Sequence, residues 1–253
     1  MTVNRLDAAP RRDRIAVMAA LAILTAVSWA YLVRGAGIEM DQMDMGGGQI
    51  MLMAPAWTVG HAALVLLMWV VMMAAMMLPA ATPAVLQAAA GGPASALLFT
   101  AGYLSIWIAF SAVATLAQWG LDSADLLSES MASRSAVAAG LLLLAVGLYQ
   151  VSRLKQSCLQ HCRACADHQP QNAPEDAGAM LRRGLRYGVS CLGCCGVLMG
   201  LLFVGGVMNV AWMAAIAVGV LAEKLLPWGT VLARLAGVGL IAWGIISLAA
   251  APL

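Results

Sequence analysis

The chain has 253 residues, of which 62% are hydrophobic and 10% are charged, with a mean hydropathy of +0.87 and a formal net charge of +2. A water-soluble domain of this length carries far more charge, so these values exclude that class of protein. No block rich in Lys or Arg points to nucleic-acid binding. We therefore expect an all-α, polytopic transmembrane helix bundle whose main surroundings are the lipid bilayer.

Apolar runs along the chain predict about seven membrane spans. A bilayer core about 30 Å thick needs roughly 20 apolar residues in a helix. The runs lie at 15–34, 59–80, 95–119, 135–152, 186–205, 208–222 and 230–250. The sixth run is short and follows the fifth across two glycines, so six spans are an alternative. The runs are too long and too uniformly apolar for barrel strands, which leaves one transmembrane helical domain over 1–253.

The distribution of Lys and Arg between the connecting segments predicts the orientation. Four arginines precede the first run, and six Lys or Arg residues lie in or beside a long polar loop at about 153–185. The segments at 35–58 and 120–134 are acidic instead. Basic residues mark the cytoplasmic side, so we expect a multi-pass protein of a bacterial inner (cytoplasmic) membrane with a cytoplasmic N-terminus. The first run is long enough to be a retained helix rather than a signal peptide.

Cysteine residues gather in two groups near the side that we expect to be cytoplasmic. The first group combines three cysteines with a histidine at helical spacing i, i+3, i+4 and i+7, and consists of Cys158, His161, Cys162 and Cys165. The second combines three cysteines with a thioether one turn later, and consists of Cys191, Cys194, Cys195 and Met199. The cytosol keeps thiols reduced, and clustered thiolates with a histidine suit Cu(I) or Zn(II).

Methionine residues gather in two further places. Three of them, Met40, Met43 and Met45, alternate with acidic residues in the outward segment. In the second apolar run, Met68, Met72 and Met76 recur every four residues beside Met73 and Met77, which places the thioethers in a stripe along one helix. Thioethers prefer Cu(I), so the outer residues could collect the ion and the stripe could pass it across the bilayer.

Each of these groups also has a plainer interpretation. Methionine is a pliable packing residue, and the cysteines of the second group stand beside Gly193, Gly196 and Gly200, which favour close helix contact. The two cysteine groups meet only if the long loop folds back onto the bundle. The adjacent residues Glu223 and Lys224 are read as an interfacial ion pair, although a buried carboxylate there would be functional.

The residues at these positions give the chain a resemblance to a known family. The matching segments are 69–79, 149–150 with Lys155, Cys158, Leu159, His161, Cys162 and Arg163, then 184–188, Cys191, 193–195, 198–199, 203–209 and 223–229. With these segments the chain resembles the DUF2182 family of predicted metal-binding integral membrane proteins. Two positions depart from the expected pattern: Gly196 replaces a tryptophan, and Ala164–Cys165 replace a proline.

The sequence as a whole predicts a membrane protein that binds a soft transition metal, with copper(I) favoured and zinc as the alternative. We expect it to transport the ion or hand it over between the membrane faces, with a metal chaperone or a membrane complex as partner, and we expect no enzymatic role. Two alternatives stay open: a non-catalytic subunit or assembly factor of a membrane complex, and a membrane thiol or quinone redox protein.

Overall fold

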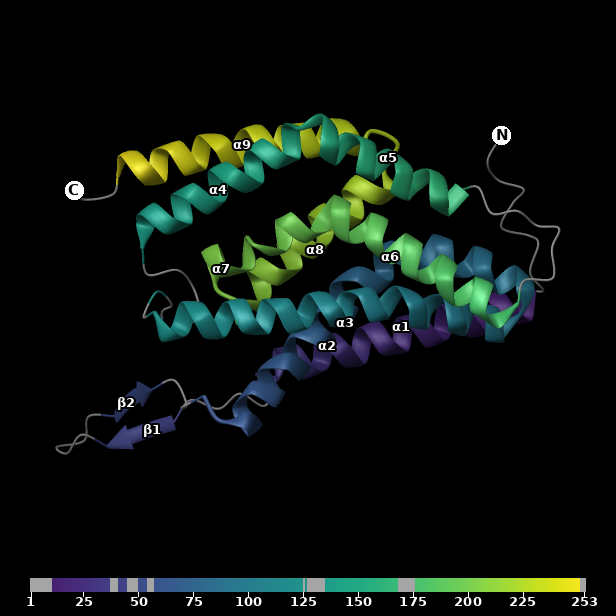
Figure 1. Cartoon of the computed structure of the whole chain (residues 1–253), viewed down its shortest axis with the longest axis horizontal. Helices are drawn as coiled ribbons and strands as arrows, with labels where there is room; N and C mark the ends of the chain where they lie inside the picture. The colour runs from purple at the N-terminus through teal and green to yellow at the C-terminus, as the bar shows by residue number, and fades with distance from the viewer. Residues whose placement is uncertain are drawn as a thin grey trace.

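A computed structural model describes residues 11–36, 41–44, 50–53, 57–124, 126, 135–167 and 176–250, and gives the backbone alone for 41–44, 50–53 and 164–167. The helices are α1 (Arg11–Val33), α2 (Val59–Ala88), the short 3-10 turn η2 (Ala89–Gly91), α3 (Pro93–Ser123), α4 (Ala136–Val151), α5 (Arg153–Asp167), α6 (Ala177–Met199), α7 (Leu202–Gly205), α8 (Val210–Leu225) and α9 (Gly229–Ala249). The all-α expectation is confirmed, and the long helices run side by side as a bundle (Figure 1).

Five helical segments are long and apolar enough to cross a membrane. They are 11–33, 59–91, 93–123, 177–205 and 229–249. The bent pair α4 and α5 makes a sixth if it is one span. The count is therefore five or six among the described residues, compared with about seven expected. One expected span that is not counted is α8, because its 16 residues extend only about 24 Å along the helix axis.

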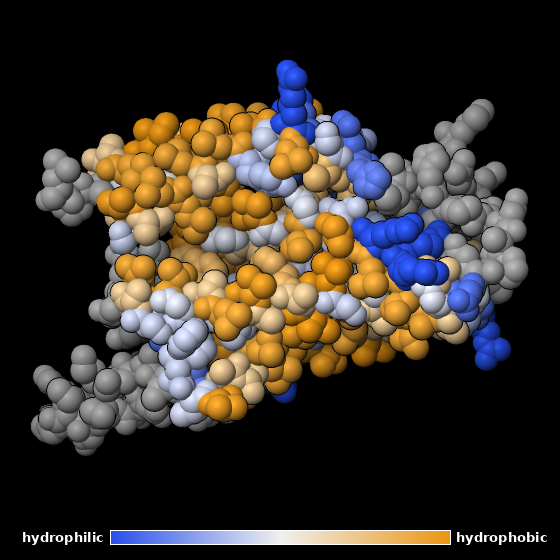
Figure 2. Space-filling model, in the orientation of Figure 1, coloured by the Kyte–Doolittle hydropathy of each residue, from blue (hydrophilic) through white to orange (hydrophobic). Residues whose placement is uncertain are grey.

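The outer surface of the bundle is apolar. Leu97, Ile23 and Ile246 are 71%, 64% and 65% exposed, and apolar side chains cover most of the face shown in Figure 2. Hydrophilic side chains gather toward one end of that face. A surface of this kind is unfavourable in water and suits a lipid environment.

Helix α2 is the most buried of the candidate spans and packs against α1, α3 and α8. Its first turn is capped by Thr58, whose hydroxyl accepts a hydrogen bond from the His61 backbone amide. All five methionines of its predicted stripe are at most 1% exposed. The stripe therefore faces the protein interior and not the lipid.

Helices α3 and α6 approach each other backbone to backbone, because glycines face each other at the crossing. A Cβ atom on Gly184 would collide with the Phe99 carbonyl, and one on Gly102 would collide with the Leu181 carbonyl. Gly188 lies against Ile106 one turn further along α6. Small residues at a helix crossing are typical of membrane bundles, and here they fix the position of the helix that carries three of the cysteines.

Helix α5 begins where α4 ends, and the two axes differ by 60°. Ser152 separates them: its backbone is extended, and its hydroxyl accepts a hydrogen bond from the Lys155 amide at 3.2 Å. That bond is a helix N-cap, which starts a new helix in a new direction. The segment expected as a polar loop at 153–185 therefore contains α5 and the first residues of α6, and α5 packs against α6.

The segment that we expect to face outward contains two short strands, β1 (Asp41–Asp44) and β2 (Ile50–Met53), which pair in antiparallel register. Met43 stands opposite Met51 in this register, and Asp41 stands opposite Met53. The hairpin lies at the same end of the bundle as the end of α9, whereas α1 and α6 both begin at the other end (Figure 1). These strands were not predicted from the sequence.

Candidate metal centre

Three buried cysteines on α6 form the candidate metal centre. Their spacing puts Cys191, Cys194 and Cys195 on adjoining turns of one helix face, and their sulfur atoms all lie within 4.8 Å of one another. All three side chains are 0% exposed. The Cys194 and Cys195 sulfurs are 3.1 Å apart, and Cys194 also donates to the Cys191 carbonyl at 3.2 Å. All three are free thiols and therefore available as ligands.

Helix α5 packs against α6 and carries two more cysteines, Cys158 and Cys162, so the two groups of cysteines predicted from the sequence lie near each other. The buried Cys162 thiol lies close enough to the Cys191 and Cys194 thiols to interact with them, although it is outside the set of three with mutually close sulfurs. Cys158 is half-buried, and its sulfur lies 3.5 Å from the position that a Gly193 Cβ atom would take. The exposure of the thiols thus decreases from Cys158 through Cys162 to the cysteines of α6.

Cys191 has two polar neighbours from other helices. The Lys224 ammonium of α8 donates to its sulfur at 2.7 Å, and the Tyr103 hydroxyl of α3 lies 3.2 Å from the same sulfur. The Tyr103 hydroxyl also donates to the Met77 carbonyl of α2 at 3.2 Å. A cation beside a cysteine favours the thiolate, which is the form that binds metals.

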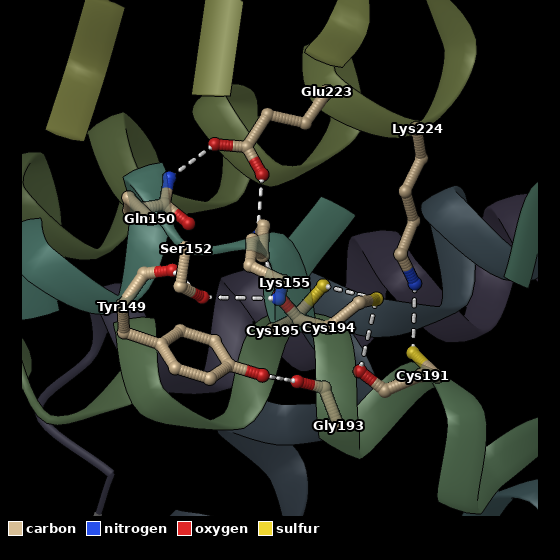
Figure 3. A network of polar contacts seen from close by, with 10 residues as sticks. All are labelled: Tyr149, Gln150, Ser152, Lys155, Cys191, Gly193, Cys194, Cys195, Glu223 and Lys224. Atoms are coloured by element: carbon tan, nitrogen blue, oxygen red, sulfur yellow. Dashed lines mark hydrogen bonds and ion pairs between the residues drawn. The ribbon is translucent and has the colours of Figure 1, made fainter. Parts of the chain in front are cut away.

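A second buried polar network lies directly beside the cysteines (Figure 3). Lys155 of α5 pairs with Glu223 of α8 at 2.8 Å, and their side chains are 0% and 3% exposed. The Lys155 ammonium also donates to the Cys194 carbonyl at 2.5 Å. Gln150 of α4 donates to the other Glu223 oxygen at 2.6 Å. The network thus links four helices at the three-cysteine group.

The end of α8 explains why two charged residues reach this site. Leu226 precedes Pro227 and is extended, so the helix ends at Leu225 and leaves Glu223 and Lys224 in its last turn. The two side chains point in different directions, Glu223 toward Lys155 and Lys224 toward Cys191 (Figure 3).

The expectation that Glu223 and Lys224 form an interfacial ion pair is therefore wrong. Both are buried, at 2% and 7% exposure, and each contacts a different partner. Neighbours in a helix do not face each other, so helix geometry alone argued against the pair. Sequence reasoning also missed Lys155, Gln150 and Tyr103 as part of the site. The signal for Lys155 was its spacing, because it lies three residues before Cys158 and seven before Cys162 on the same helix face.

Other predicted ligands are not among the three residues of this group. His161 is exposed on α5, and Met199 is buried at the last residue of α6. The stripe residues Met72, Met73, Met76 and Met77 are buried in α2. Cys165 and Met43 lie in α5 and β1, where only the backbone is described, and Met40 and Met45 lie outside the described residues.

Three clustered thiols are a donor set for a soft metal ion. Thiolate sulfur selects Cu(I) or zinc, whereas carboxylate and carbonyl oxygens select harder ions. The group of mutually close donors in the described part of the chain contains three cysteines and no carboxylate. The site therefore fits a soft ion.

Comparison with known proteins gives one family. Residues 66–247 match the model of the PpoB2 family, which is described as a copper chaperone. This match supports a copper-related family, and it carries the PpoB2 name instead of the DUF2182 name of the sequence resemblance. No curated protein and no solved structure matches the chain.

Proposed function

The chain belongs to the PpoB2 family of copper chaperones, and on that premise we propose that it binds Cu(I) at Cys191, Cys194 and Cys195 and hands the ion to a partner at the membrane. The observation that carries the proposal is the buried cluster of three free thiols beside the Lys224 ammonium. Burial excludes water and oxidants from a bound Cu(I), and the thiols supply soft ligands.

Cys158 and Cys162 offer a route between the surface and the buried ligands. Cys158 is half-buried, and Cys162 follows it by four residues on the same face of α5, within reach of the Cys191 and Cys194 thiols. Thiolates exchange metal ions readily when a new ligand can bind before the old one leaves. We propose that copper passes along this series of thiols by ligand exchange, in a cytoplasmic part of the protein.

The methionine stripe of α2 offers a second route, toward the opposite membrane face. All of its members are buried, and the Tyr103 hydroxyl contacts both the Met77 carbonyl and the Cys191 sulfur. The end of the stripe is therefore adjacent to the cysteine group. We propose that these thioethers accept Cu(I) from the outward side, where Met40, Met43 and Met45 would first collect it, or deliver it there.

Copper content of the purified protein tests the proposal. The full chain is purified in detergent after growth with added copper, and its metals are measured by elemental mass spectrometry. We expect near-stoichiometric copper in the wild type and none in a Cys191→Ser/Cys194→Ser/Cys195→Ser variant. Cys158→Ser is the matched control, because it removes a thiol outside the buried group and should keep the copper.

Equal copper in the wild type and the triple variant would overturn the assignment of the site. A protein that folds but contains no copper in any form would overturn copper handling itself. In that case the remaining hypotheses are a redox protein, which would show reversible Cys194–Cys195 oxidation, and a subunit of a membrane complex, which would co-purify with its partners.

A further inference from the structure

The three-cysteine group and Cys162 belong to different helices, so something must hold them together. Cys191, Cys194 and Cys195 lie on α6, which is fixed against α3 by the glycine contacts at Gly102 and Gly184. Cys162 lies on α5, which departs from α4 by 60° at Ser152. The distance of Cys162 from the group therefore depends on how α5 is held.

From these contacts we infer that the buried Lys155–Glu223 ion pair positions α5 so that Cys162 serves as a further sulfur donor to the metal bound by the three cysteines of α6. The inference rests on the proposed function, because it concerns the same site. Lys155 and Cys162 are seven residues apart and thus lie on one face of α5. The face that carries the buried ammonium is the face that carries the buried thiol.

The ammonium of Lys155 joins three helices at one point. It belongs to α5, pairs with Glu223 of α8 at 2.8 Å and donates to the Cys194 carbonyl of α6 at 2.5 Å. The carboxylate is itself oriented by Gln150 of α4 at 2.6 Å. A buried charge pair with satisfied oxygens has a strong orientational preference, because breaking it leaves a charge without compensation in a site that excludes water.

Control of Cys162 would give the protein a means of releasing a tightly held ion. Cu(I) in a buried thiolate site dissociates slowly, and each sulfur that leaves the ion speeds the loss of the others. When α5 is displaced, Cys162 leaves and the ion keeps only the donors of α6. Glu223 and Lys155 are thus positioning residues that act through Cys162 and do not bind the metal.

The test is the rate at which Cu(I) leaves the full-length, copper-loaded protein in detergent when an excess of a colorimetric Cu(I) chelator is added. The variant Lys155→Met/Glu223→Met removes both charges together and keeps similar side-chain volumes, which avoids leaving one charge unpaired. We expect at least a tenfold faster release in this variant and in Cys162→Ser. Combined in one protein, the substitutions should release copper no more than twofold faster than Cys162→Ser alone, because both remove the same ligand.

Two further variants serve as a milder perturbation of the ion pair and as a control. Gln150→Met removes the Gln150 donation to Glu223 and costs little else, because the Gln150 oxygen has no hydrogen-bond partner in the described part of the chain. Gln150→Met should accelerate copper release by a smaller factor, and this effect should disappear in the Cys162→Ser background. If Lys155→Met/Glu223→Met does not fold, Gln150→Met takes its place in the test. Arg234→Gln removes an exposed contact from α9 to Gln156 of α5 and should change the rate less than twofold.

If Lys155→Met/Glu223→Met increases the rate of copper release by the same factor with and without Cys162, the inference is overturned, because the ion pair would then act on the whole fold. Unchanged release in Lys155→Met/Glu223→Met would overturn it as well. A wild-type protein that binds no Cu(I) would instead contradict the proposed function, so the two failures are distinguishable.

Discussion

At the scale of single residues, we expect the buried lysine beside Cys191 to affect copper affinity. The Lys224 ammonium lies 2.7 Å from the Cys191 sulfur and is 7% exposed. A hydrogen bond to a charged group contributes about 1.5–3 kcal/mol. We expect Lys224→Met to weaken Cu(I) binding by roughly 10- to 150-fold, measured by competition with a Cu(I) chelator.

Lys224→Arg keeps the positive charge and should retain most of the affinity, whereas Arg234→Met, which removes an exposed cation from α9, should have no effect. Equal or tighter binding by Lys224→Met would show that the ammonium competes with copper for the sulfur instead of supporting its binding.

The sequence identified candidate ligand residues, but it could not show which of them lie together in the buried site. Helical spacing put Cys191, Cys194 and Cys195 on one face, and the structure brings their sulfurs together. The same spacing grouped His161 with Cys158 and Cys162, yet His161 is exposed on α5. Spacing says which residues share a face of a helix. Only the packing of α5 on α6 decides which part of that face is buried.

At the scale of elements, the crossing of α3 and α6 sets the frame of the site. Gly184→Ala would place a methyl group against the Phe99 carbonyl, and overpacking of this kind costs about 1–3 kcal/mol. Gly120→Ala is the matched control, since a Cβ atom there meets nothing within 4 Å. Replacing glycine by alanine inside a helix should stabilise by about 0.5–1 kcal/mol.

We therefore expect a lower unfolding temperature in detergent for Gly184→Ala and an equal or higher one for Gly120→Ala. Equal behaviour of the two variants would contradict the close backbone approach of α3 and α6.

The methionine stripe of α2 makes a separate prediction about transfer. Met72→Leu/Met76→Leu/Met77→Leu preserves volume, so each substitution should cost less than about 1.5 kcal/mol while removing all three thioethers. If the stripe conducts Cu(I), copper uptake into proteoliposomes should slow at least several-fold, with unchanged copper content at the three-cysteine group. Unchanged uptake would leave the methionines with a packing role.

Element boundaries followed the apolar runs where local signals agreed with them. The runs at 59–80 and 95–119 are the inner parts of α2 and α3, and the run at 230–250 is close to α9. The start of α5 was missed although Ser152 stands where a helix cap is expected, because the preceding run conceals a change of direction. The length of α6 was also underestimated, since its first turns contain three arginines that the apolar count excludes.

At the scale of the whole molecule, the basic and acidic segments predict an orientation that can be measured. Arg34, after α1, and Arg182, in α6, are both exposed and belong to opposite ends of the bundle. In a Cys158→Ser background, Arg34→Cys should react with a membrane-impermeant maleimide in intact cells. Arg182→Cys should react only after permeabilisation, because we place it on the cytoplasmic side. The reverse labelling would contradict the predicted orientation of the chain in the membrane.

We propose that the buried cysteines of α6 hold Cu(I), and X-ray absorption spectroscopy at the copper edge of the loaded, full-length protein tests this assignment. We predict the edge of Cu(I) with only sulfur neighbours in the first shell, and loss of that signal in the Cys191→Ser/Cys194→Ser/Cys195→Ser variant. A first shell of nitrogen and oxygen, or a sulfur shell that persists in the triple variant, would contradict this assignment and place the copper site elsewhere in the chain.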